Sequence, residues 1–553
     1  MVPAGASSLA WTVVAIEKAA GKPASDAMKS TQKVVPAVPV TVQQATLVQL
    51  DKSFAMPAAA PADAIAERGG LRVALQPTLS GSLDGVRRYF ENYPFACLEQ
   101  KTSKAIGLRD RALWQSVAAA IPNYLDEDGL AAYFPGSRGS DTLTAYVLAA
   151  THEAGYAIPD NARERMEGAL IAFVEGRIQR NFWAPAKDLE PRKIAAIEAL
   201  SRTGKATPKL TESITLQPNL WPTHTVIDWL SILQRVAGIP KRDEHLAAAE
   251  QVLRARLSMQ GTKLVFSTER EDYWWWLMVG GDVNAARLIA AVAERPGWRE
   301  DLPRLVSGLL ARQTKGAWQT TTANLWGGLA LDKFAAKFES EKVAGATRAA
   351  IEEKGELKGT QTLQWSAQPQ GGALNLPWPK SEGGIKVTHE GAGKPWLTVQ
   401  SLAAIPLTAP FAAGYRVTRS VTFVEQKKKD AYTRGDVLRI KLEVDASADM
   451  TWVVVADPVP AGATILGGGL ARDSTVAQQG ERKAGDATPT YEERGFEAFR
   501  AYYEYAPKGK WSIEYTVRLN QDGEFSLPPT RVEAMYAPEM FGVVPNARMK
   551  VAQ

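Results

Sequence analysis

Cysteine and histidine are scarce in this chain of 553 residues, which contains one cysteine and four histidines. A single cysteine excludes a disulfide within the chain, so the redox compartment cannot be read from cysteine pairing. The histidines, at 152, 224, 245 and 389, are dispersed along the chain and form no close ligand pair with Cys97. We therefore predict no metal site and no cofactor.

Long apolar runs and a surplus of one charge are also absent. The 65 basic and 60 acidic residues are interspersed and leave a net charge of +5, without the basic stripe typical of nucleic-acid binders. No apolar run approaches the length needed to cross a bilayer. The first residues lack the charged and apolar regions of a secretory signal. We predict no nucleic-acid partner and no membrane-spanning segment in this chain.

The one cysteine stands three positions before a glutamine, in Cys97-Leu98-Glu99-Gln100. A thiol and an amide at this spacing can face each other across a tight turn, so the sulfur can displace ammonia and form an internal thioester. The alternative is that Cys97 is a small buried apolar residue, as free cysteine often is.

The surroundings of the motif favour the thioester. Pro94 disfavours a helix just before it, and residues 101–121 are predicted to form one helix. The pair then lies where an extended segment turns into a helix, a place where unpaired backbone donors polarise nearby carbonyl groups.

Four segments of the chain each resemble a different part of one protein family: residues 85–100, 140–148, 318–331 and 535–542. They resemble the thioester region, two thioester-domain helices and the end of the terminal domain of bacterial α2-macroglobulins, in the complement and α2-macroglobulin superfamily. The resemblance covers nearly the whole chain and is most specific at Cys-Leu-Glu-Gln. Because members of the family are much longer, it implies that this chain is a C-terminal part.

Length and periodicity indicate several domains of α+β class. Residues 1–74 and 346–412 read as β-structure, 75–345 as stacked helices, and 413–553 as an antiparallel β-sandwich, with residues 56–61 as a linker. Helical periodicity alone allows a closed toroid or an open solenoid. The resemblance implies an α/α-toroid thioester domain inserted in a small CUB-like β-domain and followed by a macroglobulin-like β-sandwich.

A thioester persists only where water is kept away. The resemblance implies that Tyr93 and Met540 shield the bond, whereas the plain alternative is an ordinary aromatic and an ordinary interface methionine.

We expect Glu99 to be solvated or to cap the helix. Among the four histidines, His224 is the best candidate to assist reaction of the thioester with hydroxyl groups, but a structural role is favoured for it. We therefore expect the thioester to react with amines. The run 273–276, Tyr-Trp-Trp-Trp, cannot face inward entirely, and at least one ring is expected at an interface.

Two functions remain. The first, implied by the resemblance, is a periplasmic, single-use protease inhibitor, not a turnover enzyme. It traps target proteases through lysine amines after cleavage of a bait region, and an N-terminal part outside this chain could anchor it to the inner membrane. The second is a non-covalent scaffold for envelope partners with an inactive or hydrolysed thioester. A toroid cyclase or lyase is disfavoured, because no paired-carboxylate cluster stands out in the sequence.

Overall fold

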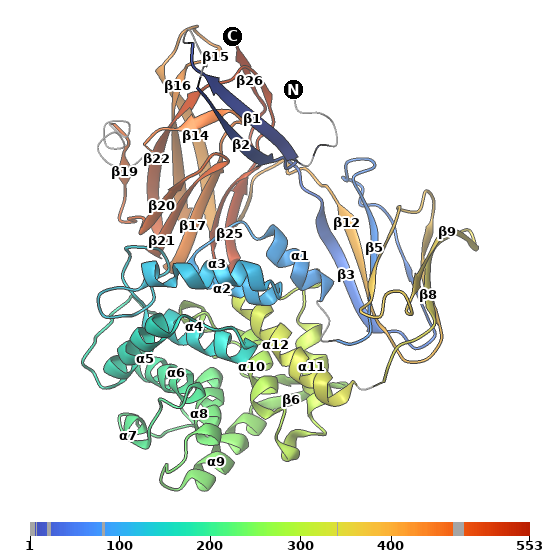
Figure 1. Ribbon diagram of the computed structural model, residues 1–553, viewed down its shortest axis with the longest axis vertical. Coiled ribbons are helices and arrows are strands. Elements are labelled where there is room, and N and C mark those ends of the chain that lie inside the picture. Colours follow the sequence, from blue (N-terminus) through green and yellow to red (C-terminus); the bar gives the residue numbers. More distant parts are fainter. Residues whose placement is uncertain (1–5, 7, 19–23, 80–82, 340, 468–479) are drawn as a thin grey trace.

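The computed structural model describes residues 6, 8–18, 24–79, 83–339, 341–467 and 480–553. It has one helical region and several mostly antiparallel sheets, which is the α+β class predicted from the sequence (Figure 1). Within the described residues, no helix is both long and apolar enough to cross a membrane.

The helical region begins at Asp84 and ends at Phe338. Its helices are α1 (Asp84–Asn92), α2 (Leu98–Gly107), α3 (Arg111–Ala120), η1 (Ile121–Tyr124), α4 (Asp141–Ala154), α5 (Asp160–Val174), α6 (Leu189–Arg202), α7 (Pro208–Thr211), α8 (Thr223–Arg235), α9 (Arg242–Ala255), η2 (Trp275–Leu277), α10 (Gly281–Val292), η3 (Pro296–Trp298), α11 (Leu302–Ala311) and α12 (Thr321–Phe338). A short hairpin of β6 (Leu257–Gln260) and β7 (Lys263–Phe266) packs on α11.

The even-numbered helices form a closed inner ring. Each of α2, α4, α6, α8, α10 and α12 contacts the next, and α12 returns to α2. Helices α3, α5, α9 and α11 each pack against one or two members of this ring. Alternate helices along the chain thus pack side by side, as stacked helical hairpins do.

The predicted single helix over residues 101–121 is wrong. The chain turns between α2 and α3, where Arg109 has a positive φ of 57° and Asp110 caps α3 by accepting a hydrogen bond from the Leu113 backbone N–H. A side chain at Gly107, the last residue of α2, would meet the Phe90 ring of α1, since a Cβ there would lie 2.1 Å from Phe90 Cε2. The close packing of α1 on α2 therefore requires glycine at this helix end.

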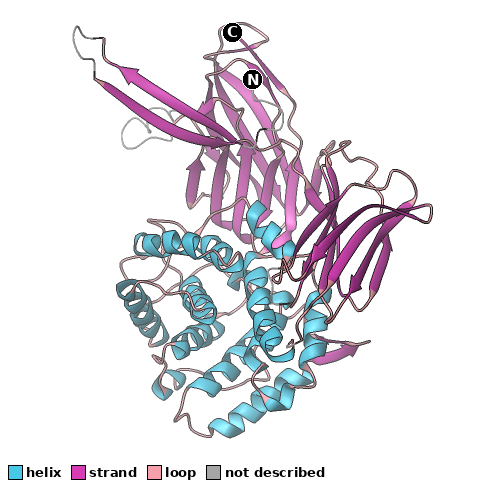
Figure 2. Ribbon diagram, turned by 45° about the vertical axis from the view of Figure 1, so that its right-hand side comes forward, coloured by secondary structure: helices cyan, strands magenta, loops and turns pink. Residues whose placement is uncertain are grey.

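Two four-stranded sheets combine strands from both sides of the helical region. They contain β3 (Thr41–Gln49), β4 (Ser53–Pro57), β5 (Gly69–Gln76), β8 (Ala346–Glu353), β9 (Glu356–Gln364), β10 (Gly372–Leu376), β11 (Gly383–Glu390) and β12 (Trp396–Ala403), in the orders β10-β5-β12-β3 and β4-β11-β8-β9. Part of the predicted linker at 56–61 is strand, because β4 pairs with β11. A separate hairpin of β1 (Ser8–Ile16) and β2 (Ser25–Lys33) projects outward (Figure 2).

The terminal part of the chain is a pair of larger sheets around their own core. One has the order β13-β25-β24-β17-β21-β20, the other β14-β16-β22-β18 with β19 beside β22, and β15-β26-β23 form a third, small sheet. The strands are β13 (Phe411–Ala413), β14 (Tyr415–Glu425), β15 (Tyr432–Thr433), β16 (Val437–Ala446), β17 (Met450–Pro458), β18 (Ala463–Ile465), β19 (Lys483–Ala484), β20 (Tyr491–Arg494), β21 (Ala498–Ala506), β22 (Gly509–Leu519), β23 (Gly523–Phe525), β24 (Thr530–Ala534), β25 (Ala537–Val544) and β26 (Met549–Ala552). Figure 1 shows these sheets standing end-on above α2 and α3.

Candidate functional site

Cys97 and Gln100 face each other at the first turn of α2. Cys97 is the N-cap, with extended backbone angles of φ −74° and ψ 174°, and its side chain accepts a hydrogen bond from the Gln100 backbone N–H. In return, the Gln100 side-chain oxygen Oε1 accepts from the Cys97 backbone N–H at 3.0 Å. This reciprocal capping satisfies two first-turn donors and holds the amide over the thiol.

Both side chains are shut off from water. Cys97 has no exposed surface and Gln100 is 2% exposed. Burial, and after it the negative charge of the Glu99 carboxylate, raises the pKa of the Cys97 thiol far above its usual range. Hydrogen bonds from the backbone N–H groups of Gln100 and Glu99 and from the Tyr536 side chain oppose the rise. The thiol is therefore protonated, and it needs a neighbouring base to become a nucleophile.

The Gln100 amide is covered by one residue from the helical region and one from the terminal sheets. Its Nε2 donates to Tyr93 Oη at 3.2 Å and to Met535 Sδ at 3.0 Å. The structure thus brings Tyr93 to the pair, but Met540 lies elsewhere. Met540 is half-buried in β25, and its side chain lies beside Gly414. The methionine over the site is Met535, which the sequence analysis missed although it lies in the segment 535–542.

From the sequence, Glu99 was expected to be solvated or to cap the helix. In the structure it is fully buried, and side-chain hydroxyl groups surround its carboxylate. Its carboxylate accepts hydrogen bonds from Ser103 Oγ at 2.5 Å, Thr321 Oγ1 at 2.9 and 3.0 Å, and Tyr536 Oη at 2.9 Å. Burial raises the pKa of Glu99, and these hydroxyl groups oppose the rise. Since Tyr536 hydrogen-bonds both Glu99 and Cys97, a continuous path joins carboxylate, phenol and thiol.

Aromatic side chains of the terminal sheets seal the site. Trp452 leaves the β17 ladder with a positive φ of 53°, a costly conformation for a bulky residue, and its ring packs on Tyr133 with centroids 3.7 Å apart. The carbonyl of Trp452 also accepts from the Met535 backbone N–H at 3.0 Å. The strained bend therefore holds Met535 over Gln100 and closes the interface beside it.

The same interface extends around the site. Phe134 stacks on Tyr491 at 4.5 Å, and Tyr273 Oη donates to the Glu539 carboxylate at 2.7 Å. Trp275 packs on Trp183 and on the core of the terminal sheets, so the expected interface position of one ring in the run 273–276 is confirmed. The helical and terminal parts thus meet through aromatic rings and through two phenol–carboxylate hydrogen bonds, Tyr273 to Glu539 and Tyr536 to Glu99.

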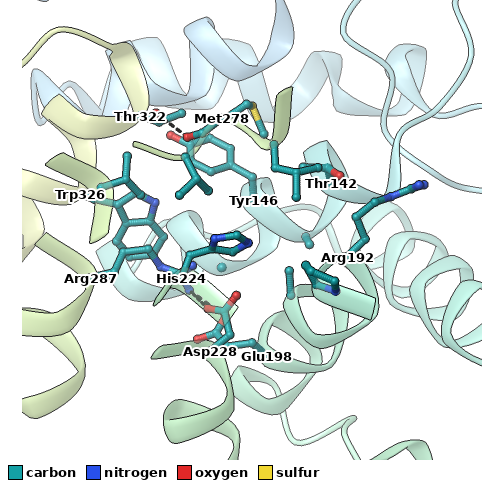
Figure 3. A pocket seen from close by; sticks show the side chains of 17 residues that line it. Thr142, Tyr146, Arg192, Glu198, His224, Asp228, Met278, Arg287, Thr322 and Trp326 are labelled. Carbon is teal, nitrogen blue, oxygen red and sulfur yellow. Dashed lines mark hydrogen bonds and ion pairs between the residues drawn. The ribbon is translucent and has the colours of Figure 1, made fainter. Parts of the chain in front are cut away.

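His224 lies apart from Cys97 and Gln100. It sits on α8, where it contacts Trp274 with ring centroids 5.4 Å apart, and it lines a cavity inside the helical ring (Figure 3). The structure thus gives no support for a helper histidine at the thioester. In the part of the chain that is described, no group of three or more histidine, cysteine or acidic residues could hold a metal ion.

The fold and site define a class: a two-part α+β assembly with a buried cysteine–glutamine pair at its interface. Residues 414–539 match the family model described as the bacterial alpha-2-macroglobulin MG10 domain. An alpha-2-macroglobulin homolog of Nostoc sp. is 23% identical over 450 residues, 77% of this chain and 23% of that protein. Alpha-2-macroglobulin of Escherichia coli K12 is 24% identical over 566 residues, 92% of this chain and 31% of that protein.

Solved structures agree on the fold. Native E. coli alpha-2-macroglobulin from domain MG7 to the C-terminus superposes with a TM-score of 0.69 at 17% identity, over 99% of this chain and 87% of that one. Salmonella alpha-2-macroglobulin reacted with methylamine gives a TM-score of 0.66 at 16% identity, over 99% and 38% of the two chains. The predicted resemblance is confirmed: this chain is similar to the C-terminal region of bacterial α2-macroglobulins. It spans about a quarter to a third of the length of the curated relatives it matches.

Proposed function

We propose that this chain is the C-terminal part of a bacterial protease inhibitor that captures its target covalently through a thioester between Cys97 and Gln100. The observation that carries the proposal is the amide of Gln100 held on the capping thiol and covered by Tyr93 and Met535. The curated relatives named alpha-2-macroglobulin support the inhibitor class, and the methylamine-reacted Salmonella protein supports reaction with primary amines.

Two acyl-transfer steps account for the chemistry. In the first, the Cys97 sulfur attacks the side-chain carbonyl carbon of Gln100, the C–N bond breaks, and ammonia leaves with the thiol proton. In the second, a lysine amine of the attacking protease attacks the same carbon, an amide forms, and the C–S bond breaks to restore the thiol. Each molecule captures once, so the protein is an inhibitor rather than an enzyme.

The path from Cys97 through Tyr536 to Glu99 handles the proton in both steps. In the first step Tyr536 and Glu99 take up the thiol proton as sulfur attacks and return it to the departing nitrogen, which leaves as ammonia. In the second step the attacking amine gives up a proton, and the transfer through Glu99 and Tyr536 delivers a proton to the leaving sulfur. Burial keeps Tyr536 neutral, because it raises the pKa of the phenol well above its usual range, so the hydroxyl can both donate and accept.

The residues that cover the bond determine how it can be exposed. Met535 and Tyr536 belong to the terminal part, so a shift of that part away from α2 uncovers Gln100. The trigger in this proposal is protease cleavage of a bait region, which we recognise nowhere in this chain. We further propose a periplasmic location, with anchoring through sequence outside the chain.

The domain layout is part of the same proposal. The closed ring of helices supports an α/α toroid at residues 75–345. The sheets that combine strands before and after it support a CUB-like host at 1–74 and 346–412, with a macroglobulin-like sandwich at 413–553. The host would move the toroid, and the sandwich would cover it.

Intact-protein mass spectrometry tests the proposal. A thioester lowers the mass by one ammonia, and methylamine then adds one methylamine and releases one titratable thiol. Cys97→Ala abolishes capture of a protease while it leaves the fold intact. A full mass with a titratable Cys97 before methylamine treatment would contradict the inhibitor and favour the non-covalent scaffold for envelope partners.

A further inference from the structure

A cavity lies at the centre of the helical ring, away from Cys97. Its volume is about 70 Å³, and it is lined by side chains of α4, α6, α8, α10 and α12 (Figure 3). Leu277, Val283 and Trp326 supply much of its apolar wall, while His224 and Asp228 project into it from α8.

The side chain of His224 is the first indication that this cavity binds a ligand. The side chain is 3% exposed, and neither ring nitrogen has a hydrogen-bond partner among the residues that the structure describes. Burial, followed by the charges of Arg287 and Arg256, lowers the pKa of His224 to about 3. The imidazole is therefore neutral, and it offers one N–H donor and one nitrogen acceptor. Buried polar groups of this kind normally have partners.

Asp228 supplies a third unused polar atom, one helical turn from His224. Its Oδ1 forms an ion pair with Arg287 Nη2 at 2.5 Å, whereas Oδ2 is buried and has no hydrogen-bond partner within the described part of the chain. Positions i and i+4 lie on one helix face, and Figure 3 shows the carboxylate beneath the imidazole ring. Among the described residues, a donor and two acceptors on α8 are thus left without partners at one wall of the cavity.

The charged side chains that line the cavity are already compensated. Arg287 pairs with Asp228, Arg192 pairs with Asp141 at 2.5 Å, and Glu198 pairs with Arg202 at 2.7 Å. A charged ligand would add an unpaired charge to these compensated groups and would lose its own hydration on entering the cavity. The cavity therefore favours an uncharged ligand.

We propose that this cavity binds a small polyol of about three carbons, with its hydroxyl groups on His224 and Asp228 and its carbon chain against Trp326 and Val283. The volume holds on the order of five water molecules, which corresponds to about six non-hydrogen atoms. A hydroxyl group both donates and accepts, so neighbouring hydroxyls satisfy the imidazole N–H, its free nitrogen and Oδ2 together. The proposal does not depend on the thioester.

Isothermal titration calorimetry with glycerol tests the site, with acetate and trimethylammonium as charged probes of similar size. We expect 1:1 binding of glycerol and no heat from either ion. His224→Phe fills the space and removes both polar atoms, so it weakens glycerol binding at least tenfold. His152→Phe, at an exposed position on α4, leaves binding unchanged. Circular dichroism establishes that both variants fold.

A crystal structure of the wild-type protein grown with glycerol provides the second measurement. Density for a three-carbon chain between His224 and Asp228 supports the proposal. Ordered water alone at these atoms, without a calorimetric signal, would overturn it. Tighter binding of acetate or trimethylammonium than of glycerol would also overturn it, because the ligand would then be charged. Equal binding by the His224 variant would place glycerol elsewhere and refute the site.

Discussion

The sulfur of Met535 lies 3.0 Å from the side-chain nitrogen of Gln100, although 435 positions separate the two residues. Met535 belongs to the turn between β24 and β25, where its backbone is held by the carbonyl of Trp452, while Gln100 lies on the first turn of α2. Under the proposed function, a thioester at Gln100 would therefore be covered by the terminal part. The following predictions test this dependence and the packing behind it.

Met535→Ala opens the cover over Gln100. Under the proposed function, we expect methylamine to react on the order of tenfold faster, since removing about 1.4 kcal/mol of barrier has that effect. The measurement is the rate of thiol release. Met540→Ala is the matched control, because Met540 lies half-buried away from the pair, and its rate should match wild type. Equal acceleration by both variants would contradict the assignment to Met535.

Tyr273→Phe removes the hydrogen bond between the helical part and Glu539. A hydrogen bond to a charged group contributes about 1.5–3 kcal/mol, and part of that loss should appear as faster methylamine reaction. Glu539→Gln should act in the same direction. The double variant should then be no faster than the stronger single variant, whereas additive effects would show that the two side chains act separately.

Glu99→Gln disturbs the proton path and the three hydroxyl groups that donate to the carboxylate. An amide offers them one acceptor oxygen instead of two, so Tyr536 loses its fixed orientation. We expect a smaller fraction of molecules with thioester, measured by the mass deficit of one ammonia in freshly purified protein. Ser103→Ala removes one hydrogen bond to Glu99 but leaves Tyr536 on the carboxylate, and it should retain most of the thioester. A full thioester content in Glu99→Gln would exclude the proton role.

Acid should weaken the fold in part through Glu153. Burial raises the pKa of this carboxyl, but Arg202 and Lys333 outweigh it and lower the pKa to about 2, from 4.5. Its contribution to stability is present above pH 4.5 and is lost as the pH falls toward 2. Glu153→Gln should flatten that part of the stability curve in urea unfolding, whereas Glu164→Gln, at an exposed position on α5, should reproduce the wild-type slope.

Gly107→Ala should destabilise the protein by about 1–3 kcal/mol, because the new methyl group overlaps the Phe90 ring. Gly168, in the middle of α5, has open space where a Cβ would stand. Gly168→Ala should therefore be neutral or stabilise by up to about 1 kcal/mol through helix propensity. Thermal unfolding of the two variants measures the difference, and equal shifts would contradict the packing account.

The sequence by itself determined those features that depend only on residues close together in the chain. Cys97 and Gln100 face each other because their spacing matches one helical turn and Pro94 keeps the preceding segment extended, so the pair could be predicted from local sequence. The position of Tyr93 beside the pair was expected from the family resemblance. The period of apolar residues also revealed which segments are helical and which are β-structure.

Only the tertiary structure decided the rest. The break after α2 depends on how closely Phe90 packs against Gly107, which no local pattern encodes. The burial of Glu99 and the choice of Met535 over Met540 depend on how the terminal sheets dock on α2, where Trp452 holds the Met535 backbone and packs on Tyr133. The cavity that His224 and Asp228 line forms only when the helices close into a ring, so separate positions in the chain give no sign of it. Contacts between distant segments follow from packing of the whole, and local spacing cannot anticipate them.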